Sequence, residues 1–510
     1  MVSQRFVAVS FAIALATLAP RAGELAAVEN PRFVAAPCPF PADDATLKQV
    51  RCGYVAVPEN RAKADSRRFK LAVAILKSSS ATPRPDPVVI VAGGPGEHFV
   101  SRAPTLIANG SMDIIRADRE VILYDQRGVG FSEPAFCPEL ADERAGGRGT
   151  FESPLDRRAF QREMSVRCGD SMRRAGYDLS QYNSVVSSHD LQDLRRALGY
   201  KEWNLHGRSY GSRLTLNAMR VAPEGIRSVV LDGPVPPNRA KWFNMPGDFT
   251  DVLERLSAEC ASQPECNAAF PAVEQTFWRT VAALQREPFP LQRTLVNGTV
   301  RTQTVTAPRF AAAVHAALER IQPAVPLFVH AMHSRNAAVV DAVALALTRA
   351  AAGRPAGIST GMAQTVGCFE EAPLATPELQ QAARKKYSPV LTDEGVFAGP
   401  EGCDAVHPYR ASPQQLTAVK SDIPTLILTG EFDLQTHRSN GPLVAASLKN
   451  SQLVEIPHVT HVQSFRHDCT RTIMRDFHNA PAKKVDTACL AAIPPLRFFT
   501  DAKQLTSTAR

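Results

Sequence analysis

Hydrophobic and polar positions follow two different rhythms along the chain. From about Tyr54 to Pro234, short apolar runs bounded by Gly, Pro or charged residues alternate with segments of helical spacing. The apolar runs predict strands over residues 69–76, 87–92, 120–124, 203–206 and 226–231. Strands that alternate with helices build a largely parallel sheet with both faces covered, so this part predicts an α/β fold.

One helix start in this region has a recognisable pattern. The segment from Ser187 to Asp190 resembles a capping box, and Leu191, Leu194 and Leu198 follow at helical spacing. Gly199 then ends the pattern, as glycine commonly does after a helix.

The middle of the chain has a different pattern. From about Pro236 to Gln414 the spacing predicts long helices, for example over 249–287 and 307–351, interrupted by a hairpin at Asn297-Gly298. Strand signals return at 425–428 and 453–456. We therefore predict an α/β core over 28–235, a helical cap over 236–414 and completion of the core over 415–510.

The first residues have the three parts of an export signal. Met1 to Arg5 is positively charged, Phe6 to Ala19 is apolar, and small residues follow up to Ala27. The apolar run is shorter than the roughly 20 residues that a bilayer span needs. We expect residues 1–27 to be a cleaved signal peptide and the mature protein to be secreted or periplasmic, without a membrane anchor.

Composition fits a globular exported protein, with 44% hydrophobic and 21% charged residues. The ten cysteines contain no C-x-x-C pair, and export favours disulfides. Neighbours along the chain can pair, although the sequence does not prove the connectivity. These pairs are Cys38–Cys52, Cys137–Cys168, Cys260–Cys266, Cys368–Cys403 and Cys469–Cys489.

The net charge of +8 is spread along the chain, and acidic residues are interleaved with the basic ones. The longest basic run is only Arg384 to Lys386, so the charge indicates a solvated surface and no nucleic-acid partner. The sequence leaves the oligomeric state open, and no cofactor is expected.

The string Gly207-Arg208-Ser209-Tyr210-Gly211 matches the nucleophile-elbow pattern G-x-S-x-G. A predicted strand precedes it and an amphipathic helix follows it. The two glycines let strand and helix approach, and the serine stands at a helix N-terminus that favours negative charge. Ser209 is the predicted nucleophile.

A serine nucleophile needs a base, and a carboxylate to orient that base. Asp433 follows the strand at 425–428 and is the candidate acid, with Glu431 as the alternative. His461 follows the next strand and is the candidate base. His458 and His467 compete with it, His437 lies too close to Asp433 in sequence, and a His458–His461 metal pair lacks further ligands.

The loop Ala92-Gly93-Gly94-Pro95-Gly96 follows the predicted strand at 87–92. Such a loop can aim a backbone N–H at the developing oxyanion, together with the N–H of the residue after the nucleophile. We predict Gly94 and Tyr210 as these donors, with Gly93 as the alternative to Gly94.

Together, Gly93 to Gly96, Asp125-Gln126-Arg127-Gly128 and the elbow resemble the proline iminopeptidase and tripeptidyl-aminopeptidase group of α/β-hydrolases. The tail from about Leu416, with Asp433, His461 and Asp486 to Leu490, resembles that group's C-terminal TAP-like module. The resemblance implies an α/β-hydrolase fold, an acyl-enzyme and a Ser209–Asp433–His461 triad.

One departure from the group weakens a strictly prolyl specificity. Ala92 stands where proline iminopeptidases usually have His. We also expect Asp125 to Arg127 to brace the loops around the site through an ion pair.

An aminopeptidase must hold the ammonium group of its substrate. Cys368-Phe369-Glu370-Glu371 resembles the acidic cap segment that the group uses for this purpose, so we expect Glu370, with Glu371, to bind the α-amine. The predicted activity is removal of N-terminal residues or short peptides from small peptide substrates. The alternatives are an esterase or lipase on the same triad and a catalytically silent scaffold.

Overall fold

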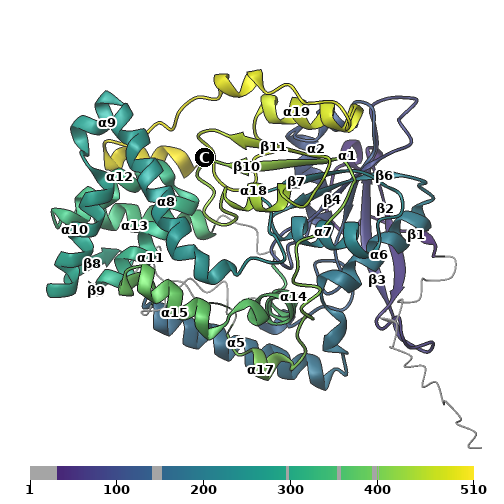
Figure 1. Cartoon of the computed structure of the whole chain (residues 1–510), viewed down its shortest axis with the longest axis horizontal. Helices are drawn as coiled ribbons and strands as arrows, with labels where there is room; N and C mark the ends of the chain where they lie inside the picture. The colour runs from purple at the N-terminus through teal and green to yellow at the C-terminus, as the bar shows by residue number, and fades with distance from the viewer. Residues whose placement is uncertain are drawn as a thin grey trace, which may run out of the picture.

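A twisted, mostly parallel sheet forms the centre of the computed structural model, which describes residues 31–140, 152–294, 298–352, 358–392, 399 and 401–509 (Figure 1). Within this described part, nine strands follow the order β1-β2-β3-β5-β4-β6-β7-β10-β11. Their bounds are β1 Phe33–Ala35, β2 Val50–Pro58, β3 Arg68–Leu76, β4 Val88–Val91, β5 Val121–Tyr124, β6 Trp203–Arg208, β7 Ile226–Asp232, β10 Thr425–Gly430 and β11 Ser451–Ile456. The strands from β5 to β11 in this order run parallel, and β1, β2 and β3 form an antiparallel edge.

The predicted α/β class and all seven predicted strands are confirmed. Strands β1 and β2 were not predicted from the sequence. Strand β2 contains Cys52-Gly53, and its side chains alternate between buried and partly exposed positions, as expected near the edge of a sheet.

Helices cover both faces of the sheet, because alternate strand residues point to opposite faces. On β4, Val89 and Val91 join one apolar cluster, which includes Leu194 of α6 Ser184–Leu198 and Leu214 of α7 Tyr210–Val221. Val88 and Ile90 join the cluster on the other face, with the segment that contains α2 Ala103–Ala108 and α3 Asp113–Arg116.

Helix α6 begins three residues before the predicted capping box. The Asn183 side chain accepts hydrogen bonds from two backbone amides of the first turn, and the helix ends at Gly199 in the left-handed conformation. Ser187 and Asp190 therefore lie inside the helix, which corrects the predicted start but confirms the predicted end.

The helical block forms the cap, at the left of Figure 1. The helices predicted over 249–287 and 307–351 are each broken into three pieces. The elements are α8 Lys241–Ser262, α9 Pro264–Ala269, α10 Val273–Arg286, α11 Ala307–Arg320, α12 Val325–His333 and α13 Ala337–Ala352. The predicted hairpin is present as the antiparallel pair β8 Phe289–Thr294 and β9 Val300–Val305, while Asn297 of its turn lies outside the described residues.

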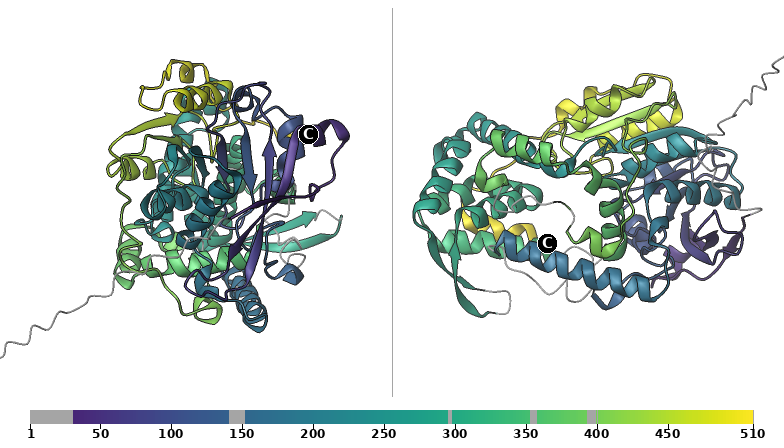
Figure 2. Two further views of the ribbon diagram at one scale, coloured as in Figure 1. Left: turned by 90° about the vertical axis from the view of Figure 1, so that its right-hand side faces the viewer. Right: turned by 60° about the horizontal axis from the view of Figure 1, so that its bottom comes forward.

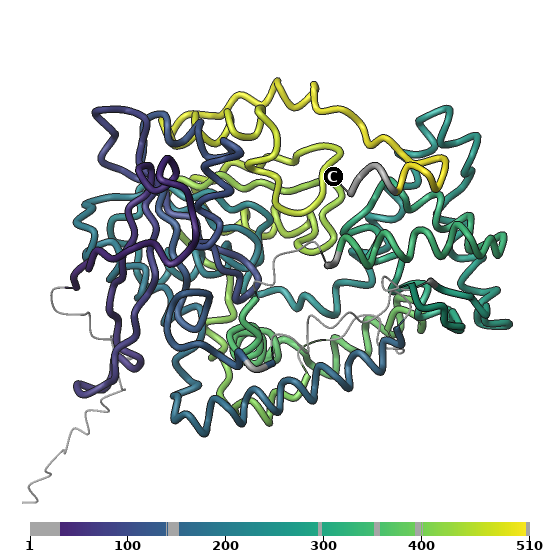
Figure 3. Tube along the Cα trace, turned by 180° about the vertical axis from the view of Figure 1, so that it is seen from behind, coloured from purple at the N-terminus to yellow at the C-terminus, as the bar shows by residue number. Residues whose placement is uncertain are grey.

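Two segments outside 236–414 also belong to the cap's surroundings. Helix α5 Pro154–Arg174 runs along the lower edge of the molecule in the right-hand view of Figure 2 and packs against α14 Thr360–Val366 and α17 Cys403–Val406. Beyond α19 Asp468–Asn479, the C-terminal segment crosses from the core to the cap (Figure 3). There Phe498 and Leu505 are buried in the cap's apolar cluster.

All five predicted disulfides are present, with the predicted pairing of neighbours along the chain. The predicted signal peptide lies outside the described residues. In the part of the chain that is described, no helix has the length and apolar character needed to cross a bilayer.

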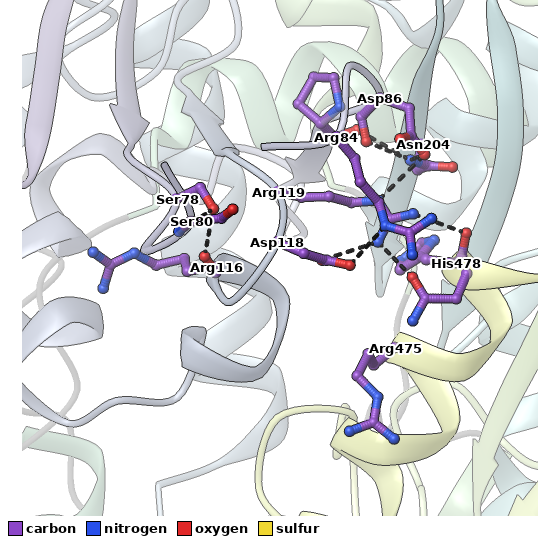
Figure 4. Close-up of polar contacts among 12 residues, drawn as sticks. Ser78, Ser80, Arg84, Asp86, Arg116, Asp118, Arg119, Asn204, Arg475 and His478 are labelled. Carbon is purple, nitrogen blue, oxygen red and sulfur yellow. Dashed lines mark hydrogen bonds and ion pairs between the residues drawn. The ribbon is translucent and has the colours of Figure 1, made fainter. Parts of the chain in front are cut away.

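A buried polar network closes the other end of the sheet, away from the loops after β6 and β10 (Figure 4). Arg119 donates to Asp86, at 3.2 Å, and to the backbone oxygen of His478 on α19, at 3.3 Å. The His478 imidazole lies 3.2 Å from the Ser228 hydroxyl. Burial, together with the nearby Arg119 and Arg227 guanidinium groups, lowers the pKa of His478 to about 3. This histidine is therefore neutral at ordinary pH.

Candidate active site

The predicted chemistry gathers at the carboxyl ends of the parallel strands, where α/β sheets place their ligand sites. Ser209 follows β6 directly and has φ 53° and ψ −126°, a strained conformation for a residue with a side chain. Its backbone N–H donates to the Asp232 carbonyl oxygen on β7, at 2.9 Å. A side chain at Gly211 would collide with the Val91 carbonyl oxygen, so glycine is required where α7 passes β4.

Asp433 and His461 meet although 28 residues separate them. The Asp433 Oδ2 atom lies 2.8 Å from His461 Nδ1. Asp433 is fully buried, and its Oδ1 atom accepts the backbone N–H groups of Gln435 and Thr436, at 2.9 and 2.8 Å. These bonds hold the carboxylate in one orientation toward the imidazole.

The electrostatics of this pair favour an ionised aspartate. Burial raises the pKa of Asp433, but the His461 imidazole and the hydrogen bonds from Thr436 outweigh burial and bring the pKa below its ordinary value. Asp433 is thus a carboxylate at neutral pH.

Thr436 is a residue that the sequence analysis missed. Its hydroxyl donates to Asp433 Oδ2 at 2.7 Å and lies 3.1 Å from His461 Nδ1. The spacing Asp433-x-x-Thr436 after a strand was the available signal, since a hydroxyl three residues beyond an acid can turn back to it.

The His461 ring lies beside Gly233, close to the elbow. A Cβ built on Gly233 would lie 3.3 Å from His461 Cε1, and Gly233 follows Asp232, whose carbonyl oxygen binds the Ser209 N–H. Among the described residues no hydrogen bond joins the Ser209 hydroxyl to an imidazole. The Nδ1 face of His461 is used by Asp433 and Thr436, which leaves Nε2 as the ring atom for Ser209.

The competing residues have other partners. The Glu431 carboxylate accepts the His458 backbone N–H at 2.9 Å, and His458 Nδ1 lies 3.3 Å from Glu259. His437 lies between Asp248 and Asp251 of α8, at 3.2 and 2.9 Å. His467 precedes α19. No group of three or more candidate metal ligands occurs in the described ranges.

The loop after β4 contains the glycines that were predicted as oxyanion donors. The Gly93 N–H donates to Glu97 Oε2 at 3.2 Å, whereas the Gly94 and Tyr210 N–H groups have no acceptor among the described residues. Gly94 has φ +103° and lines the same pocket as Ser209 and Tyr210. The geometry therefore favours Gly94 over the alternative Gly93.

Asp125 and Gln126 brace this loop, whereas Arg127 bonds to helix α6. Asp125 accepts the backbone N–H groups of Phe99 and Val100 at 2.7 and 3.0 Å, and Gln126 donates to the Ala92 carbonyl oxygen at 3.1 Å. The expected ion pair is formed by Arg127, which donates to both oxygens of Asp190.

Core and cap together enclose a pocket of about 340 Å³ above Ser209. Its volume lies within the roughly 300–1,000 Å³ typical of small-ligand sites. The core contributes Gly94, Ser209, Tyr210 and Thr436, and the cap and α5 contribute most of the remaining wall.

The two glutamates predicted to bind an amine lie in different places. Glu370 is buried and faces inward, where its carboxylate accepts the Ser184 backbone N–H at 2.6 Å and lies 3.7 Å from Arg213. Burial raises the pKa of Glu370, against the opposing effect of Arg213. Glu371 lines the pocket and accepts the Trp242 indole N–H at 2.8 Å. The structure therefore shifts the preference from Glu370 to Glu371.

The cap also contacts the segment that carries the acid. Phe432 and Leu434, on either side of Asp433, are buried in the cap's apolar cluster. Packing of the cap thus helps to fix the position of the carboxylate, a link that sequence periodicity does not reveal.

Comparison with known proteins matches residues 86–268 to the family model of the alpha/beta hydrolase fold. A tripeptidyl aminopeptidase of Streptomyces lividans is 30% identical over 202 residues, which are 38% of this chain and 37% of that protein. The serine protease Hip1 of Mycobacterium tuberculosis is 28% identical over 225 residues, 42% of each chain. The match spans less than half the length of each of these relatives. A proline iminopeptidase structure from Mycobacterium smegmatis aligns over 84% of this chain and 98% of its own, with TM-score 0.39 and 14% identity.

Proposed function

We propose that this chain, an α/β-hydrolase related to tripeptidyl aminopeptidases, is an exported serine aminopeptidase that cleaves short N-terminal segments from peptides through an acyl-enzyme. The observation that carries the proposal is the 2.8 Å contact between Asp433 and His461, placed beside the strained elbow of Ser209. Five disulfides suit an oxidising compartment and support export.

In the proposed mechanism, Ser209 Oγ attacks the carbonyl carbon of the scissile peptide bond while His461 Nε2 takes the hydroxyl proton. Asp433 keeps the Nδ1 proton of the imidazole on its own side and stabilises the imidazolium. The carbonyl oxygen becomes an oxyanion that accepts the N–H groups of Gly94 and Tyr210. Each such donor is worth about 3–4 kcal/mol of transition-state stabilisation.

His461 then changes from a base to an acid. His461 returns its proton to the leaving amine, and the C–N bond breaks to leave an ester between Ser209 and the N-terminal fragment. A water molecule then gives a proton to His461 and attacks the ester carbonyl, and Ser209 regains its proton as the acid leaves.

Glu371 is the proposed contact for the substrate's ammonium group. Glu370 and Glu371 share one guanidinium, Arg213, at 3.7 and 3.6 Å, so two carboxylates face a single fixed cation. The uncompensated negative charge lies on the pocket side, where an α-ammonium would be attracted and an N-acylated peptide would not.

Peptides with a free or an acetylated N-terminus, digested by the wild-type protein and by Ser209→Ala and read by mass spectrometry, test this function. We expect release of N-terminal fragments from the free peptides only, and no release by Ser209→Ala. Glu371→Gln should raise KM for free-amine substrates about tenfold, the typical size of one partly exposed charge contact. Acyl esters cleaved faster than every peptide would instead identify an esterase.

A further inference from the structure

The charged side chains that line the active-site pocket are of both signs. Arg157 and Arg158 come from the beginning of α5, Lys241 from the start of α8, and Glu371 and Glu401 from the cap region. Which of these charges already have a partner decides what the pocket can attract.

Two of the five form an ion pair with each other. Arg158 pairs with Glu401, with a shortest N–O distance of 2.7 Å. Glu371 accepts the Trp242 indole N–H but shares its cation, Arg213, with Glu370. The two positive side chains that remain in the pocket wall are Arg157 and Lys241.

Arg157 and Lys241 form no ion pair with any described acidic residue. Lys241 lies over the Trp242 ring, 5.1 Å from its centroid, and Glu152 and Glu319 act on Arg157 only at longer range. Burial lowers the pKa of Arg157, and its place in the first turn of α5 opposes the helix dipole. The fold thus holds the Arg157 guanidinium in an unfavourable position, together with Lys241 at the wall of the pocket that contains Ser209.

We infer that Arg157 and Lys241 bind a carboxylate of the substrate, so that the enzyme prefers short peptides that carry one. This inference rests on the proposed aminopeptidase function. If the substrates are peptides, the negative groups that they carry are carboxylates. An arginine guanidinium can donate two hydrogen bonds to a carboxylate, and a lysine adds a third donor. With Glu371 in the same pocket, the site complements both charges of a short zwitterionic peptide.

The carboxylate has two sources, an acidic side chain and a free C-terminus, and matched tetrapeptides separate them. The first pair is tetra-alanine as free acid and as amide. The second pair is an amidated tetrapeptide with Glu or Gln at one position, and that position is varied along the peptide. The value of kcat/KM is measured by mass spectrometry for the wild-type protein, Arg157→Gln, Lys241→Gln and the double variant. Lys385→Gln on the exposed face of α15 Pro377–Lys386 is the control for net charge.

We expect the wild-type protein to favour the carboxylate-bearing member of at least one pair about tenfold, and 0.5 M salt to reduce the ratio. The ratio should approach one in the double variant and persist in Lys385→Gln. Ratios near one in the wild-type protein, or a ratio preserved in the double variant, would overturn the inference.

Labelling of Ser209 by a fluorophosphonate reports whether each variant is folded. If the double variant is not folded, the ratios of the wild-type protein test the carboxylate preference. Cleavage of neutral amidated peptides without any carboxylate preference would remove this inference and leave the aminopeptidase intact. Failure to cleave any peptide would remove the proposed function itself.

Discussion

Replacing Asp433 by Asn should leave the fold in place and nearly abolish catalysis. In the structure, Asp433 Oδ1 accepts two backbone N–H groups while Oδ2 faces His461 Nδ1 and the Thr436 hydroxyl. The two backbone donors fix the asparagine oxygen on their side, because the opposite orientation would set the amide nitrogen against two N–H groups. The amide NH₂ must therefore face the imidazole.

An NH₂ group at that position reverses the tautomer of His461. Nδ1 becomes an acceptor, so the ring proton moves to Nε2, where it points at Ser209 and prevents the ring from taking the serine proton. We expect kcat to fall about 10³–10⁴-fold, which corresponds to about 4–5.5 kcal/mol of activation free energy. Active-site-titrated protein assayed on a peptidyl arylamide measures the loss.

Glu431→Gln is the matched control, because it removes a carboxylate two residues away that binds only the His458 segment. Its kcat should change less than about threefold. A loss below tenfold in Asp433→Asn, with an unchanged melting temperature, would refute the orientation argument. The depressed pKa of Asp433 adds stability above its ordinary value of 3.8, and that stability is lost as the pH falls through the folded-state value. Asp433→Asn should lack this loss of folding stability at low pH.

Three further changes test other parts of the structure. Gly94→Ala places a side chain at φ +103° and 2.8 Å from two backbone nitrogens, so kcat/KM should fall about 10²–10³-fold; a change under threefold would remove Gly94 from the oxyanion site. His478 has a folded-state pKa of about 3, below its ordinary 6.5, so the unfolded chain binds the proton first and stability falls as the pH drops from 6.5 toward 3. Urea unfolding should show a loss of about 2 kcal/mol from this group between pH 6.5 and 4.5, which His478→Gln should lack. The double variant Cys137→Ser/Cys168→Ser opens a disulfide that spans 31 residues and should cost about 2–5 kcal/mol in the same assay; equal stability would show that the cross-link contributes nothing.

Local patterns in the sequence predicted the parts of the molecule that local physics determines. The elbow at Ser209, the strands that carry it, and the disulfide pairs could be named because a strand, a tight turn and short loop closures depend on neighbouring residues. Strand β2 escaped prediction because a half-exposed strand near an edge lacks the continuous apolar run of a buried one.

The parts that sequence patterns missed depend on contacts between distant segments. Nothing in Cys368 to Glu371 tells which glutamate turns inward, since Ser184 and Arg213 decide it from elsewhere in the chain. The packing of α5 on the cap is similar, because this helix is mostly polar and its few apolar residues do not identify the surface that it covers.

The location of Phe498 and Leu505 has a consequence for the order in which the molecule is completed. A ribosome delivers the chain from its N-terminus, so α8 to α13 are available long before these two residues that fill their cluster. The cap must therefore wait for Phe498 and Leu505 to be synthesised before its interior is fully packed. Since Phe432 and Leu434 join the same interior, the geometry around Asp433 matures at that moment too, and a chain released too early by a stop codon would carry every proposed catalytic side chain in an unfinished setting.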